Sequence, residues 1–108
     1  DLPTLRARLA EMSARTEQSR ALLGYTLSEM EQPTEATPLY VLQARLAAIQ
    51  AAVDVTDLAM KACGGAAFSK HLAIERLFRD ARAGWVMAPT ADHLKDFIGR
   101  ALTGLPLF

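Results

Sequence analysis

The segment Ala62–Thr90 reads ACGGAAFSKHLAIERLFRDARAGWVMAPT, and the rest of the chain is interpreted outward from it. It contains a helix end, a break at Gly64-Gly65, an apolar run with Glu75-Arg76, a charged stretch at 79–82 and a restart at Pro89-Thr90. Two glycines after a helical pattern indicate the end of a helix, and a proline before a threonine indicates a break before the next helix. The segment therefore predicts the end of one helix, a complete second helix and the start of a third.

Two long helices are predicted before this segment. Apolar or small residues recur at steps of three and four in both, which is the pattern of one helical face. In the first helix they are Leu2, Leu5, Leu9, Met12, Thr16, Ser19, Leu23, Thr26 and Met30; in the second they are Leu39, Leu42, Leu46, Ile49, Val53, Thr56, Met60 and Cys63. Alanines cover much of the rest of the second helix, so we expect it to be central and to contact more than one neighbour.

A polar loop at 31–37 that contains Pro33 separates these two helices. Because the loop is short, we expect the helices to be antiparallel neighbours. Thr37 is the predicted N-cap of the second helix, with Pro38 at its first position, where a missing N–H costs nothing.

Two shorter helices follow the glycines. Ser69 is the predicted cap of a helix that runs to about Val86, and Thr90 caps a last helix that ends at Gly104. The tail 105–108 reads LPLF and is too apolar for a solvated terminus, so we expect it to pack against the bundle or a partner subunit. The pattern as a whole predicts an all-α fold, an antiparallel up-down four-helix bundle spanning residues 1–108 as one domain.

Composition narrows the classes of function. The 12 basic and 12 acidic residues cancel, so the chain has no field that would attract nucleic acid or an acidic membrane surface. No apolar run reaches the roughly 18 residues of a membrane span. One cysteine, Cys63, excludes an intrachain disulfide and a zinc cluster, and we expect no metal site and a reducing, cytoplasmic location. The chain begins at Asp1 without methionine, so we expect it to be part of a longer protein with any targeting signal upstream.

Gly64-Gly65 and the charged residues of the third helix each allow two interpretations. One glycine caps a helix, whereas two also suit a backbone that must approach a phosphate or another chain closely. Glu75 with Arg79 and Arg76 with Asp80 stand four apart, which is typical of intrahelical ion pairs. The same residues could instead form an ion-pair network with a neighbouring helix.

The segment resembles the C-terminal domain of the acyl-CoA dehydrogenase flavoenzymes. Members of that family carry a pattern like Q-x-x-G-G-x-G-Y, then P-x-E-R, then R-D-A-R, then a loop that ends in threonine. The matching positions here are Lys61, Gly64, Gly65, Ala67, Phe68, Ala73, Glu75, Arg76, Arg79, Asp80, Ala81, Arg82 and Thr90. The chain departs from the family at Lys61 in place of glutamine, at Ala67 in place of glycine, at Phe68 and at Ala73.

The resemblance implies a flavin cofactor. In the family, the Gly-Gly turn and the threonine loop lie near the pyrophosphate and adenosine end of FAD, across a subunit interface. Gly64, Gly65, Thr90 and Lys61 are therefore the candidate cofactor contacts. We expect FAD in the full-length protein and none in the isolated chain, because the family's flavin site also needs domains that are absent here.

The resemblance also implies the chemistry: α,β-oxidation of an acyl thioester, with acyl-CoA as the substrate. Many members place the catalytic glutamate in the threonine loop, where this chain has Ala88. Alanine cannot abstract a proton, so we expect no catalytic residue in this chain, and the isolated chain to be inactive. Two alternatives stay open: a flavin monooxygenase or oxidase of the same superfamily, and a helical oligomerisation module without an active site. In either case we expect a homo-oligomer, a dimer or a tetramer.

Overall fold

The computed structural model describes residues 2–65 and 73–107. They form four α-helices: α1 (Leu2–Glu31), α2 (Thr37–Cys63), α3 (Ile74–Val86) and α4 (Ala91–Thr103). No strand occurs in the described ranges. The all-α prediction is confirmed.

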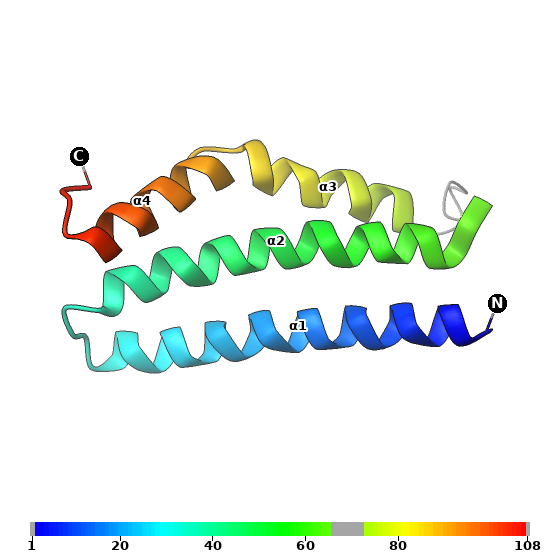
Figure 1. Ribbon diagram of the computed structural model, residues 1–108, viewed down its shortest axis with the longest axis horizontal. Coiled ribbons are helices and arrows are strands. Elements are labelled where there is room, and N and C mark those ends of the chain that lie inside the picture. Colours follow the sequence, from blue (N-terminus) through cyan, green and yellow to red (C-terminus); the bar gives the residue numbers. More distant parts are fainter. Residues whose placement is uncertain (1, 66–72, 108) are drawn as a thin grey trace.

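The central helix is α2 (Figure 1). α1 lies antiparallel to it on one side, and α3 and α4 follow one another along its other side, both antiparallel to α2. Among the described residues, α1 makes helix contacts with α2 alone, whereas α2 contacts all three other helices. The molecule is consequently elongated, about 47 × 24 × 23 Å. The prediction that the alanine-rich helix is central is confirmed.

The apolar core lies between α2 and the α3–α4 side. Leu94 and Ala91 of α4 are wholly buried against Ile49 of α2. Leu42, Leu46 and Trp85 pack around these three residues. This cluster fixes the position of α4, and therefore of the loop that precedes it.

Only part of the predicted stripe of α1 is covered. Thr26 is buried and Leu5, Met12 and Ser19 are half-buried, whereas Leu9, Leu23 and Met30 are about half exposed, at 52%, 50% and 52%. A strict seven-residue repeat drifts by about 20° per heptad around a straight helix, so one stripe can extend over two faces. Polar groups also join the two helices, including the ion pair of Arg15 with Asp54, whose nitrogen and oxygen are 2.8 Å apart.

The ends of α2 agree with the sequence to within one residue. α2 begins at Thr37 itself, with Ala36 as N-cap, and the Thr37 hydroxyl accepts the N–H of Thr34 at 2.8 Å. Pro38 stands in the first turn, as predicted. At the other end Gly64 has φ = +59° and donates its N–H to Met60, a backbone conformation that favours glycine.

The start of α3 differs from the prediction. The described helix begins at Ile74 with Ala73 as N-cap and has no side-chain cap. The predicted cap, Ser69, lies outside the described residues. By contrast, Thr90 is the N-cap of α4, and Gly104 ends that helix in the left-handed conformation, both as predicted.

The apolar tail folds back on the helix pair. Leu107 lines a groove together with residues of α1, of the following loop and of α2: Met30, Pro33, Thr37, Pro38, Val41 and Leu42. Arg100 holds the tail in place by donating to the carbonyl of Pro106 at 3.1 Å. The prediction that the tail packs against the bundle is confirmed for Leu107, whereas Leu105 is 57% exposed. None of the described helices combines the length and the hydropathy that a membrane span requires.

Candidate functional site

The first group of candidate residues lies at the C-terminal end of α2. The Lys61 ammonium group pairs with Asp57 at 3.1 Å, and the side chains of both residues are largely exposed. The carbonyl oxygen of Lys61 accepts a hydrogen bond from Arg8 of α1 at 2.8 Å, which ties the two helices together at this end. The Lys61 charge is therefore paired with Asp57, one turn before it in α2.

Gly64 and Gly65 differ in whether their backbone conformation requires glycine. Gly64 needs the freedom of glycine because its φ is positive. The φ of Gly65 is not positive, and a Cβ atom built on Gly65 would meet nothing within 4 Å. The capping interpretation thus explains Gly64 but leaves Gly65 unexplained. An exposed backbone without a side chain suits a group that approaches from outside the described residues.

The second group surrounds Thr90, in the connection from α3 to α4. The Thr90 hydroxyl oxygen accepts the N–H of His93 at 3.2 Å, so its own hydrogen is free to be donated elsewhere. The carbonyl of Pro89 accepts from Arg45 of α2 at 3.4 Å, which anchors the loop to the central helix. A helix N-terminus carries a partial positive charge, and anions bind favourably there.

The position of the family glutamate lies in the same connection. Ala88 is exposed, and its neighbour Met87 is 62% exposed, so this segment is accessible from outside. Between Asp80 and Asp92 the sequence contains no carboxylate. Asp92 lies in the first turn of α4, at the N-terminal end of that helix. No side chain of the connection itself can serve as a base.

The two groups do not meet within one chain. They lie at opposite ends of α3, and a helix of 13 residues is about 20 Å long. Figure 1 shows α3 extending between the end of α2 and the start of α4. A ligand that contacts both groups must be long, or must be shared between two copies of the chain.

The charged residues of α3 pair only in part as predicted. Glu75 and Arg79 form an ion pair at 3.9 Å, a long distance for such a contact. No pair joins Arg76 to Asp80, and none joins α3 to a neighbouring helix, in the part of the chain that the structure describes. The Arg82 guanidinium lies instead over the Phe78 ring, at 3.7 Å from its centroid. The network interpretation is not supported within this chain.

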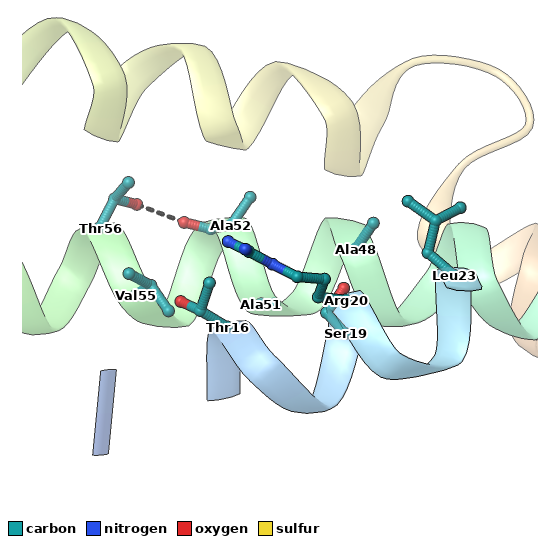
Figure 2. A pocket seen from close by; sticks show the side chains of 9 residues that line it. All are labelled: Thr16, Ser19, Arg20, Leu23, Ala48, Ala51, Ala52, Val55 and Thr56. Carbon is teal, nitrogen blue, oxygen red and sulfur yellow. Dashed lines mark hydrogen bonds between the residues drawn. The ribbon is translucent and has the colours of Figure 1, made fainter. Parts of the chain in front are cut away.

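Sequence reasoning missed two grooves along the contact between α1 and α2. Each is lined by both helices, on opposite sides of the pair (Figure 2 shows the first). The first is lined by Thr16, Ser19, Arg20, Leu23, Ala48, Ala51, Ala52, Val55 and Thr56; the second by Arg15, Gln18, Ser19, Leu22, Ala47, Gln50, Ala51 and Asp54. Small residues at Ser19 and Ala51, which line both grooves, were the available signal.

A tyrosine pair close to the loop between α1 and α2 was also missed. The rings of Tyr25 and Tyr40 meet edge to face, with centroids 5.1 Å apart. A hydrogen bond with Tyr40, and then the Glu29 carboxylate, raise the pKa of Tyr25 above its ordinary value. Tyr25 therefore stays protonated in the pH range where most proteins are studied, and the pair links the two helices at this end.

Comparison with known protein families gives one match. The chain has the all-α architecture, with a Gly-Gly helix end and a threonine-capped last helix, that the resemblance predicted. The family described as "Acyl-CoA dehydrogenase, C-terminal domain" matches residues 1–103. The chain belongs to this family. No curated protein and no solved structure matches it.

Proposed function

We propose that this chain is the C-terminal helical domain of an FAD-dependent enzyme that oxidises the α,β carbons of an acyl thioester. Family membership supports this reaction class, and the Gly64-Gly65 backbone is the observation that carries the cofactor assignment. Among the described residues, which do not include the segment 66–72 directly after it, Gly65 meets no conformational or packing requirement for glycine. A cofactor phosphate close to this backbone supplies the reason.

The residues of this chain would bind the cofactor rather than transform the substrate. Lys61 would provide charge, Gly64 and Gly65 close backbone approach, and Thr90 a hydroxyl donor beside a helix N-terminus. Bound FAD would supply the chemistry by accepting a hydride from the acyl-CoA substrate. Because the two groups lie at opposite ends of α3, we propose that a homo-oligomer, a dimer or a tetramer, completes the cofactor site.

Because position 88 is alanine, a residue in another part of the enzyme would have to abstract the proton. A general base must lie within hydrogen-bond reach of the proton that it removes, and the connection from α3 to α4 offers no carboxylate for that role. The same observation favours a second candidate: a flavin monooxygenase or oxidase of the superfamily, acting on a non-thioester substrate. A carboxylate that faces the flavin from another helix of the intact enzyme distinguishes the first candidate from the second.

Gly65→Ala in the intact enzyme tests the cofactor assignment. The new methyl group meets no described residue within 4 Å, and circular dichroism checks that the variant folds. We expect FAD to dissociate about tenfold more readily or worse, because about 1.4 kcal/mol of binding corresponds to a tenfold change. Gly24→Ala is the matched control: its Cβ also meets nothing, and it lies inside α1, far from both groups. Titration of the apoenzyme with FAD gives both values, and equal affinity in the two variants would overturn the assignment.

Thr90→Asp provides an independent test. Aspartate is at least as good an N-cap as threonine, so α4 keeps its start. Its negative charge would repel a nearby phosphate, and we expect a loss of FAD affinity without a loss of thermal stability in the apoenzyme. Thr90→Ser, which keeps the hydroxyl, should bind FAD like the wild type. If Thr90→Asp also binds like the wild type, Thr90 does not contact the cofactor phosphates.

A further inference from the structure

Arg8 of α1 reaches across to the end of α2 that precedes Gly64 and Gly65. Its Nη1 atom donates a hydrogen bond to the carbonyl oxygen of Lys61 at 2.8 Å, and Arg8 is half-buried. The two residues are 53 positions apart in the sequence, so no local pattern indicates the contact. Lys61 stands three residues before Gly64, which is less than one helical turn. Arg8 therefore brings a guanidinium group close to the candidate cofactor backbone.

The end of α2 is unfavourable for an anion by itself. The last four carbonyl groups of a helix have no partner within the helix, and this end carries a partial negative charge. In α2 they include the carbonyl of Met60, which accepts the N–H of Gly64, and that of Lys61, which accepts from Arg8. A phosphate beside Gly64-Gly65 would meet this negative end. Binding it there requires a positive charge that offsets the carbonyl groups.

Lys61 and Arg8 differ in how much net charge they bring to this end. The ammonium group of Lys61 is paired with the carboxylate of Asp57 at 3.1 Å, so the charges of the two side chains cancel. Among the described residues no carboxylate pairs with Arg8. A guanidinium stays protonated in proteins. Arg8 consequently adds a positive charge that the described part of the chain leaves uncompensated.

The remaining donors of Arg8 suit a phosphate. Arginine has five N–H donors in a planar fork, and the bond to Lys61 uses one of them. The others have no hydrogen-bond partner within residues 2–65 and 73–107. Guanidinium and phosphate groups form charge-assisted hydrogen bonds, often two at a time. A guanidinium that is already held by one bond loses less freedom when it binds an anion.

We propose that Arg8 is a cofactor-binding residue, which offsets the negative end of α2 and donates to a cofactor phosphate beside Gly64-Gly65. This role rests on the proposed function, which brings the FAD phosphates to that backbone. It adds a residue of α1 to a site whose other members belong to α2 and to the connection from α3 to α4.

Arg8→Gln in the intact enzyme removes the charge and keeps an amide that can still donate a hydrogen bond. Titration of the apoenzyme with FAD measures the effect. We expect the Kd for FAD to rise about tenfold, because a charged donor to phosphate has been replaced by a neutral one. Arg8→Lys keeps the charge and should recover most of the affinity. Wild-type affinity in Arg8→Gln would overturn the proposal.

Arg15→Gln is the matched control. Arg15 lies seven residues further along α1, on nearly the same side of the helix. It also ties α1 to α2, through Asp54 at 2.8 Å, but its charge is already paired and it lies about 10 Å along the helix from Arg8. We expect its Kd for FAD to equal that of the wild type. An equal loss in the two variants would mean that Arg8 only holds the helices together, and this would overturn its role as a phosphate-binding charge.

The salt dependence of FAD binding is a readout that a purely structural role would not change. Ions screen the attraction between a charge and a phosphate, and the screening length falls to about 3 Å at 1 M salt. We expect the FAD affinity of the wild type to decrease as salt rises to about 1 M, and that of Arg8→Gln to decrease less. The same salt dependence in both would contradict a contact between the Arg8 charge and the cofactor.

The role of Arg8 and the cofactor assignment can fail separately. If Gly65→Ala weakens FAD binding and Arg8→Gln does not, the flavin site stands and Arg8 is not part of it. If neither variant weakens FAD binding, Gly64-Gly65 does not contact the cofactor, and the role of Arg8 fails with that assignment. Weaker binding in both, with Arg15→Gln unchanged, is the result that we expect.

Discussion

The two sides of α2 are held in different ways. On the α4 side, apolar residues are wholly buried: Leu94 and Ala91 have no exposed surface, and Ile49 is 9% exposed. On the α1 side Thr26 is the one residue of α1 that is buried among its described side chains. The α4 side thus has wholly buried apolar side chains, and the described part of α1 has none.

This difference explains why a chain of 108 residues has so few buried side chains. The α4 side contains the buried apolar cluster, and hydrophobic burial is the largest favourable contribution to folding. On α1, by contrast, Leu9, Leu23 and Leu27 are about half exposed. The candidate cofactor residues lie at the two ends of α3, on the side of α2 that contains the buried cluster.

The largest expected effect is on the α4 side. Leu94→Ala removes the largest fully buried side chain and leaves a cavity, so we expect a loss of about 3 kcal/mol in the free energy of unfolding. Leu102→Ala is the control on the same helix, because Leu102 is 65% exposed and should cost less than about 0.5 kcal/mol. Urea denaturation measures both. Similar losses in the two variants would remove the distinction between the two sides.

A smaller effect is expected on the α1 side. The Thr26 hydroxyl donates to the carbonyl of Leu22 at 2.8 Å and lies 3.4 Å from that of Tyr40 on α2. Thr26→Val keeps the shape but removes the donor, so we expect a loss of about 1 kcal/mol. Thr16→Val is the control, since the Thr16 hydroxyl bonds only within α1, to Met12. If Thr26→Val destabilises the chain as much as Leu94→Ala does, the α1 side contributes more than its exposure indicates.

Much of the fold follows from local signals in the sequence. Thr90 and Gly104 mark the ends of α4 because a cap and a left-handed glycine are requirements of the backbone itself. Alanines on several faces of α2 indicate close neighbours, and the structure places α2 at the centre. These features depend on residues near each other in the chain, which is why the sequence is sufficient to predict them.

The polar contacts between α1 and α2 could not be predicted in the same way. They include the ion pair of Arg15 with Asp54 and the hydrogen bond from Arg8 to Lys61. These partners are 39 and 53 residues apart, and no periodicity within α1 indicates them. The geometry of the candidate site could not be predicted from the motif either. The motif includes both Gly64 and Thr90, but α3 lies between them and separates them in space.

The visible absorption spectrum of the intact protein tests the central claim most directly. If this chain is one part of a flavin site, the full-length protein should purify with about one FAD per chain, and the 108-residue chain purified alone should carry none. Cofactor released by denaturation and quantified against the protein gives the ratio for both. A full-length protein that is colourless and does not take up added FAD would contradict the assignment to a flavoenzyme. Stoichiometric flavin on the isolated chain would contradict the claim that its site is partial.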